Sequence, residues 1–292
     1  MIAALAQTLV PAALFLKSNS IFIKNLLLKG VFLFAILFCR GFYDIMSAEG
    51  FMTRTIEDLQ YKGLKIIQED GLFHFGTDAV LLAGFCDVKK TDTVVDLGTG
   101  TGIIPLLLSK RTGARVIGIE LQREVFELAR QNVELNGLEG KVNIINADLR
   151  TLELKEERVT AVVCNPPYEK VGSGRQNIGE SIKLARHEIC CTLEDAVSCA
   201  ARLLGTGGKL FMIHRSQRAA ELISVMSAHK LEPKVLTPIC AREGADPRYV
   251  LVAAKKDAKP GLKFNYPLVI YDKNGEYTQQ MDKIYHREKE NE

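Results

Sequence analysis

From residue 93 to residue 254, short apolar runs alternate with longer amphipathic stretches. The short runs are rich in valine and isoleucine and almost continuously apolar, which is typical of strands buried on both faces of a sheet. The longer stretches carry apolar residues at helical spacing, and two of them stop at Asn136-Gly137 and at Gly205, as helices commonly do. We expect strands at 93–97, 115–120, 142–146, 159–164, 208–213, 233–239 and 249–254, and helices at 103–111, 122–135, 193–204 and 217–229.

This alternation predicts an α/β fold, namely a Rossmann-like, doubly wound and mostly parallel sheet of seven strands with helices on both faces. The last two strands lie close together in the sequence, so we expect them to form an antiparallel hairpin at one edge. The central domain is assigned to 93–255, and a lead-in segment at 46–92 precedes it. Residues 256–292 are more polar and are expected to form a C-terminal tail that packs on the domain.

The first 45 residues have a different character. Their apolar stretch is interrupted by two lysines and an asparagine between 24 and 29, which leaves 31–39 as the longest clean run. That run is too short for a membrane-spanning helix, and no small-residue cleavage site follows it. Met46 and Met52 stand just before the soluble pattern begins. We interpret 1–45 as a mis-assigned start or a dispensable extension, with a membrane anchor as the alternative, and expect a cytoplasmic protein without stable membrane association.

The distribution of charge along the chain is more informative than the net charge. The charged fraction of 25% and hydrophobic fraction of 47% are ordinary for a soluble enzyme. The net charge of +3 equals that of 1–45, which has four basic residues and one acidic, so the remaining chain is neutral. Within it, 46–199 has 18 basic and 23 acidic residues (net −5), whereas 200–292 has 16 and 11 (net +5). The C-terminal third is therefore the better candidate for contact with a polyanion, and an ordinary solvated surface is an equal alternative.

Cysteine usage argues against a metal site. None of the seven cysteines forms a Cys-x-x-Cys pair, and no histidine stands at metal-ligand spacing from one. Most lie inside apolar runs, as reduced core cysteines do. We therefore expect no bound metal.

The run Asn165-Pro166-Pro167-Tyr168 is the most informative motif. It follows the strand expected at 159–164, so it lies at the carboxyl end of a strand, where open α/β sheets place their ligands. Two prolines make the turn stiff, since they fix φ and carry no N–H. An amide oxygen, a backbone carbonyl and an aromatic face suit a planar amino group. A rigid turn without chemistry is the alternative.

A glycine-rich turn lies upstream. Gly98, Gly100 and Gly102 follow the first expected strand and open a helix, so the backbone there can approach a ligand closely. Glu120 ends the second strand, where an acid can accept both hydroxyls of a ribose. Asp148 follows the third strand, near where an adenine amino group would lie. By themselves, a purely geometric turn and acids that only cap the next helices remain alternatives.

Asp96 narrows the choice of cofactor. It leads directly into the glycine turn, where its charge would repel a pyrophosphate but attract an ammonium or sulfonium group. A cofactor with a positive centre, an amino acid part and an adenosine part fits these residues. S-adenosylmethionine is such a molecule.

Taken together, these residues resemble the class I S-adenosylmethionine-dependent methyltransferases over roughly 70–255. Asp96 to Gly102 is similar to their glycine motif, Glu120 to the ribose-binding acid, and Asp148 to the residue that contacts adenine. Asn165 to Tyr168 resembles the motif of the branch that methylates amino groups conjugated to planar systems. The apolar 1–45 is not part of this pattern.

Within that class the chain is similar to the tRNA1(Val) adenine-N6 methyltransferases, which modify the adenosine 3′ to the anticodon. The likeness rests on Phe-Gly-Thr-Asp-Ala-Val-Leu-Leu at 75–82 and Ala-Arg-His-Glu at 185–188. It implies methylation of an adenine N6 amino group in tRNA, position 37 of a valine tRNA, by a monomer without a metal. The implied catalytic residues are Asn165, Pro166 and Tyr168. The implied cofactor-binding residues are Asp96, Gly98, Gly100, Gly102, Glu120, Asp148 and Asn165, and Pro167 and Tyr168 are expected to bind the substrate. Lys170, Arg175 and Arg186 follow in a loop suited to phosphate contact, with a solvated loop as an equal alternative. His187 is a further candidate for RNA contact, and a residue that only caps or pairs on a helix is the alternative.

Two other readings compete with this one. A glutamine amide methyltransferase acting on a release factor shares the same motif, because a carboxamide presents the same NH2 group. A non-catalytic RNA-binding relic of the fold is the second. A DNA-adenine enzyme is disfavoured, because only about 40 residues separate Tyr168 from the next strand, too few for an inserted recognition domain.

Overall fold

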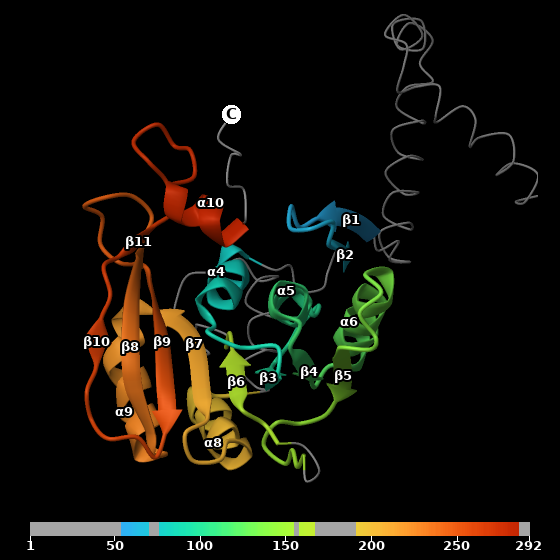
Figure 1. Ribbon diagram of the computed structural model, residues 1–292, viewed down its shortest axis with the longest axis horizontal. Coiled ribbons are helices and arrows are strands. Elements are labelled where there is room, and N and C mark those ends of the chain that lie inside the picture. Colours follow the sequence, from blue (N-terminus) through green and yellow to red (C-terminus); the bar gives the residue numbers. More distant parts are fainter. Residues whose placement is uncertain (1–53, 70–75, 155–157, 167–190, 286–292) are drawn as a thin grey trace, which may run out of the picture. The chain divides into compact units, whose positions relative to one another are not determined.

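A nine-stranded sheet forms the centre of the computed structural model (Figure 1). The structure describes residues 54–69, 76–154, 158–166 and 191–285, all within one compact unit, Arg54–Glu292. The sheet order is β10-β8-β9-β7-β6-β3-β4-β5, with β11 also paired to β8. Its strands are β3 (Thr93–Leu97), β4 (Arg115–Glu120), β5 (Val142–Asn146), β6 (Ala161–Cys164), β7 (Lys209–Arg215), β8 (Leu231–Cys240), β9 (Tyr249–Lys256), β10 (Lys263–Phe264) and β11 (Leu268–Val269).

Helices cover both faces of this sheet, as the continuously apolar strands require. One apolar core includes residues of α4, α5 and α10, and the core on the other face includes residues of α8 and α9. The helices are α4 (Thr77–Phe85), α5 (Ile103–Thr112), α6 (Arg123–Leu135), α8 (Leu193–Leu203), α9 (Ala219–Ala228) and α10 (Gln279–Tyr285), with a 3-10 turn at Ser216–Arg218. The predicted doubly wound α/β fold is thus confirmed.

The antiparallel edge differs from the prediction in two details. The hairpin β8–β9 is present, but β9 lies between β7 and β8 and runs antiparallel to both. The sheet also gains β10 and β11, because two short pieces of the C-terminal tail pair parallel with β8. Pro233 and Pro238 lack the N–H groups that a long partner strand would need, so β8 has only two-residue partners on this side.

A lead-in hairpin, β1 (Arg54–Asp58) and β2 (Lys65–Glu69), is attached to the sheet through α6. The Asn132 amide donates to Ile67 O at 3.2 Å and accepts from Ile67 N at 2.6 Å. One turn later the Asn136 amide makes the same pair of bonds with Lys65. Asn132 also donates to Thr101 O at 2.9 Å, inside the glycine turn. The amides of Asn132 and Asn136 therefore bond the backbone of β2 as a neighbouring strand would. Asn132 also holds the glycine turn in place.

We expect Asn132→Ala to lower the free energy of unfolding by about 2–4 kcal/mol, because it leaves the partly buried backbone groups of Ile67 and the buried carbonyl of Thr101 without these partners. Urea unfolding monitored by circular dichroism measures this change. Asn143→Ala is the control, since Asn143 is exposed on β5. Equal stabilities for the two variants would contradict the assigned role.

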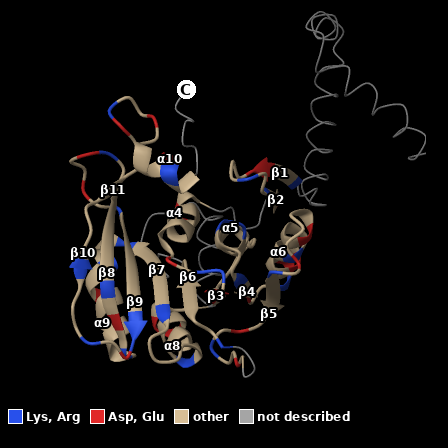
Figure 2. Ribbon diagram, in the orientation of Figure 1, with Lys and Arg blue, Asp and Glu red and all other residues tan. Residues whose placement is uncertain are grey.

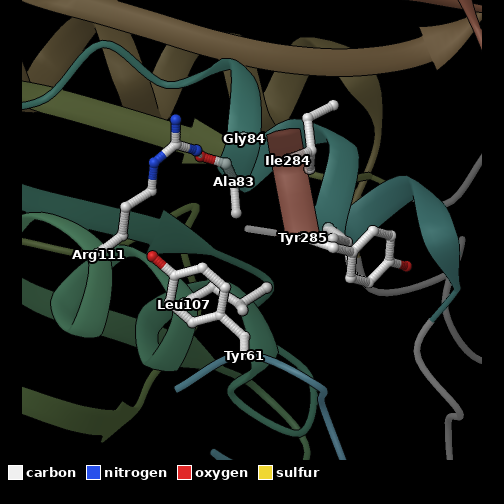
Figure 3. Close-up of a pocket in the computed structure, with 8 residues that line it drawn as sticks. Tyr61, Ala83, Gly84, Leu107, Arg111, Ile284 and Tyr285 are labelled. Atoms are coloured by element: carbon white, nitrogen blue, oxygen red, sulfur yellow. Dashed lines mark hydrogen bonds between the residues drawn. The ribbon is translucent and has the colours of Figure 1, made fainter. Parts of the chain in front are cut away.

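The helix α10 of the C-terminal tail packs against α4. Met281 of α10 is fully buried, and a Cβ at Gly84 would lie 2.9 Å from Ile284 Cγ2, so glycine permits the close approach of the two helices. Figure 3 shows this contact beside Arg111, whose Nη1 donates to Ala83 O at 3.2 Å. The gap here is about 10 Å³, room for about one water molecule. It is a packing defect and not a ligand site.

Candidate active site

The first predicted site residues lie where the strand order reverses. From β3 the chain continues outward through β4 and β5, whereas β6 and β7 extend the sheet in the other direction. β3 and β6 are parallel neighbours, with Leu97 opposite Cys164. The glycine turn and Asn165 therefore leave the sheet side by side at its carboxyl edge, the edge toward which the β6 arrow points in Figure 1. Open α/β sheets bind ligands at this kind of position.

Asp96 is the most deeply buried acid of the site. Its side chain is fully buried on β3, and burial raises the pKa of its carboxyl group to about 7. Oδ2 accepts a bond from Thr99 Oγ1 at 2.6 Å, while Oδ1 has no hydrogen-bond partner among the described residues. A buried carboxylate oxygen without a partner suits a cationic ligand group, since a cation would repay the desolvation of the charge.

Glycines shape the turn that follows Asp96 and leave room for Thr99, which bonds it. Gly98, Gly100 and Gly102 all have φ between +57° and +86°, a region that other residues rarely adopt. On the neighbouring strand, a Cβ at Gly118 would lie 2.8 Å from Thr99 Oγ1. The bare backbone of β4 therefore leaves room for the hydroxyl that holds Asp96.

Glu120 ends β4 beside this turn and is only 7% exposed. Its Oε2 accepts from Gly100 N at 3.0 Å and its Oε1 from Gln122 N at 2.9 Å. Burial raises the pKa of Glu120, and the backbone N–H groups oppose that rise. Each oxygen keeps a lone pair for another donor. A carboxylate held in this way suits the two hydroxyl groups of a ribose.

Asp148 bonds a residue of its own turn. It follows β5 near Glu120, but its two oxygens accept bonds from Arg150 Nε at 2.9 and 3.0 Å. The bond from the Arg150 side chain lowers the pKa of Asp148. Its carboxylate is thus largely satisfied by its own turn, and the contact to an adenine amino group stays a prediction.

Asn165 stands just past the end of β6 and is half-buried, and Pro166 beside it is buried. The Asn165 Nδ2 donates to Asp78 Oδ2 at 3.0 Å. Asp78 belongs to the first turn of α4. Cys164, the residue before Asn165, is fully buried, and burial raises the pKa of its thiol well above the usual range, so it stays protonated and unreactive.

The structure thus brings together Asp96, the glycine turn, Glu120 and Asn165. The other predicted residues, Pro167, Tyr168, Lys170, Arg175, Arg186 and His187, lie outside the described residues. Asp78 was missed as a site residue, although it lies inside the string at 75–82 that carried the resemblance. The available signal was an acid placed at the start of an otherwise apolar helix.

Within 54–69, 76–154, 158–166 and 191–285, no group of histidine, cysteine, aspartate and glutamate residues has the arrangement to hold a metal ion. In the same part of the chain, no helix is both long and apolar enough to cross a membrane. The five cysteines described there are free thiols.

Known proteins are similar to this chain in sequence and in fold. A family model described as the methyltransferase small domain matches residues 64–231. The tRNA1(Val) (adenine(37)-N6)-methyltransferase of Histophilus somni (strain 129Pt) is 25% identical over 226 residues, which cover 76% of this chain and 92% of that protein. A protein of the same name from Trichodesmium erythraeum (strain IMS101) is 28% identical over 190 residues, covering 62% and 79%. The crystal structure of a predicted O-methyltransferase from Agrobacterium tumefaciens superposes with a TM-score of 0.58 at 26% identity, covering 72% of this chain and 95% of that one.

Proposed function

The chain belongs to the methyltransferase small domain family, and from that premise we propose that it methylates the N6 amino group of an adenosine in tRNA, position 37 of a valine tRNA. The observation that carries the proposal is the position of Asn165, which begins the amine-binding motif beside the buried pair Asp96 and Glu120. The relatives named for this reaction support the substrate class. We further propose that the enzyme acts as a cytoplasmic monomer.

S-adenosylmethionine is the methyl donor, and when bound it supplies an electrophilic methyl group on a sulfonium centre. Three features of the chain fit it. Oδ1 of Asp96, which has no hydrogen-bond partner in the part of the chain that the structure describes, suits its positive end, and Glu120 suits its ribose hydroxyls. The positive-φ glycines let the backbone approach it closely. The role of Asp148 toward the adenine ring is part of the proposal.

Asn165 and Pro166 would bind the amine that is methylated. The lone pair of an adenine amino group is delocalised into the ring, so the group is a weak nucleophile. Bonds from its two N–H groups to Asn165 Oδ1 and to the Pro166 carbonyl would hold it in place and favour a pyramidal nitrogen. The same acceptors stabilise the positive charge that grows on nitrogen during transfer. The methylated ammonium can then lose its proton to water, so no dedicated base is needed.

The target base must leave its stack for its amino group to reach Asn165 and Pro166. Tyr168 is proposed to stack on the extruded adenine, while Pro167, Lys170, Arg175, Arg186 and His187 are proposed to contact the RNA around it. Positioning the amine against the methyl group contributes on the order of 7–11 kcal/mol to lowering the barrier when both are held in near-attack geometry.

Part of the RNA surface is proposed to come from the C-terminal third. β8 and β7 are both antiparallel to β9, so the loop after β8 lies at the carboxyl edge with the active site. Arg242 and Arg248 are exposed in this loop, where the ribbon in Figure 2 carries both basic and acidic positions. Arg202, by contrast, donates to Leu149 O at 2.9 Å, and Arg218 bonds Glu221 at 2.8 Å, so these two have structural partners.

We expect Arg242→Gln with Arg248→Gln to weaken tRNA binding and to flatten its dependence on salt. Loss of two phosphate contacts should reduce the slope of log K against log salt by about 1.4–1.8. Binding measured at several salt concentrations tests this. Lys255→Gln with Lys259→Gln is the matched control, because it removes the same charge from the opposite edge of the sheet. Identical slopes for the two double variants would contradict the assignment.

The rival activity on a protein glutamine is tested by direct competition. Purified enzyme is given unmodified tRNA and a release-factor peptide together, with isotopically labelled methyl donor. The proposal predicts label in the RNA and little in the peptide. Preferential labelling of the peptide would identify a glutamine amide methyltransferase, and no labelling of either, with cofactor still bound, would favour a non-catalytic relic.

A further inference from the structure

Asp78 and Asn165 are 87 positions apart in the sequence, and the fold brings them into direct contact. Asp78 lies in the first turn of α4, and Asn165 begins the loop after β6. The bond runs from Asn165 Nδ2 to Asp78 Oδ2 at 3.0 Å. The proposed methyl transfer gives this bond no role.

The direction of this bond has a chemical consequence. The two ends of an asparagine amide have nearly the same shape but opposite hydrogen-bonding character. An ionised carboxylate can only accept, so Asp78 requires the NH2 end of Asn165 to face it. The Oδ1 end is then turned away from Asp78. A flipped amide would present N–H groups to the substrate amine, where two donors would repel each other.

Gly76 indicates that space is reserved for the carboxylate of Asp78. Its backbone angles, φ −105° and ψ 173°, are ordinary extended values that any residue adopts. Backbone conformation therefore does not require glycine here. A Cβ at Gly76, however, would lie 2.5 Å from Asp78 Oδ1. The missing side chain lets the carboxylate fold back over the start of α4 while Oδ2 reaches Asn165.

The simpler explanation for Asp78 is an acid at a helix N-terminus, stabilised by the helix dipole. That role explains the charge but not the bond to Asn165 or the space left by Gly76. Glu124 offers a comparison within the same chain, since it is an exposed acid in the first turn of α6.

We propose that Asp78 is a positioning residue for the methyl transfer: it fixes the Asn165 amide so that Oδ1 accepts from the substrate amine. The charge of Asp78 also polarises the amide and strengthens Oδ1 as an acceptor. This inference rests on the proposed function. In this role Asp78 acts through Asn165 and contacts neither the substrate nor the cofactor.

The test is a double-mutant cycle on single-turnover methylation. Asp78→Asn keeps the shape but removes the acceptor-only character, and we expect the rate constant to fall about 10–100-fold, the range found when a partner that orients a metal-binding side chain is removed. Affinities for tRNA and cofactor should stay near wild type. In the Asn165→Ala background the same substitution should have little further effect, because Asp78 acts through Asn165. Gly76→Ala keeps the charge but displaces the carboxylate, so it should reproduce the loss.

Controls separate this role from helix stability. Glu124→Gln removes a first-turn acid that is not placed at Asn165 and should leave the rate unchanged. Equal losses from Asp78→Asn in the wild-type and Asn165→Ala backgrounds would overturn the proposal. So would a wild-type rate for Asp78→Asn. If the wild-type enzyme methylates a peptide glutamine and not tRNA, the proposed function fails, but the same cycle run on the peptide still decides the role of Asp78.

Discussion

Asn165→Ala is expected to lower the rate constant of methyl transfer by about 10²-fold or more. Its amide oxygen is proposed to bind the amine most strongly when that nitrogen becomes positive, so its loss affects the transition state more than the bound substrate. The dissociation constants of tRNA and S-adenosylmethionine should therefore change little. Single-turnover methylation with saturating tRNA, combined with equilibrium binding of both ligands, measures the two effects separately.

Asn143→Ala serves as the control for this substitution, because it removes an exposed amide from β5, away from the loop after β6. It should retain the wild-type rate. An Asn165→Ala enzyme that methylates as fast as wild type would exclude Asn165 from the reaction. A variant that instead loses tRNA binding, at an unchanged rate constant, would assign Asn165 to substrate affinity alone.

Asp96→Asn is expected to have two large effects of opposite sign. The first is loss of cofactor affinity by about tenfold or more, because the substitution removes a charged partner worth roughly 1.5–3 kcal/mol. The second is a gain in stability of the unliganded protein at alkaline pH. Asparagine can still accept the bond from Thr99 but carries no buried charge.

The pH dependence follows from the raised pKa. Burial raises the pKa of Asp96 from 3.8 to about 7, so the folded protein holds this proton more tightly than the unfolded chain does. Wild-type stability should therefore decline as pH rises from about 4 to 7, by on the order of 4 kcal/mol for a shift of about three pKa units. Asp96→Asn should lack this decline. Urea unfolding of both proteins at pH 5.5 and pH 8 tests the difference.

Cofactor binding should show the reverse trend. Below pH 7 the free enzyme must release the proton of Asp96 before the carboxylate can attract a cation, so affinity should fall by up to about tenfold per pH unit. Calorimetric titration of wild type and Asp96→Asn across this range measures it. If the two proteins bind S-adenosylmethionine equally and with the same pH profile, Asp96 does not face the cation.

Local sequence patterns were sufficient for the parallel part of the sheet. Short runs rich in valine and isoleucine located β3, β4 and β5 at the predicted bounds. β3 and β4 are buried along almost their whole length, and such strands tolerate few polar residues. The same patterns did not reveal β10 and β11. Each is only two residues long, and their pairing depends on the free side of β8 in the folded protein.

Side-chain contacts that form only in the folded chain explain what else the sequence did not predict. The partner of Asn165 is an acid 87 positions away, on a helix that precedes the sheet. Nothing in the sequence of α6 distinguishes Asn132, because its role depends on bonds to Ile67 of β2. Asp148 was predicted to face adenine from its position after a strand, whereas its bond to Arg150 depends on how one turn folds. Spacing locates such residues but does not give their partners.

The most direct test of the whole account is nucleoside mass spectrometry of tRNA. Unmodified valine tRNA is incubated with S-adenosylmethionine and either the wild-type enzyme or Asn165→Ala, digested, and analysed for the position and chemistry of each added methyl group. The account predicts one N6-methyladenosine, at position 37, with wild-type enzyme and very little with the variant. Methylation of another base or of a ribose, or equal N6-methyladenosine from both enzymes, would contradict it.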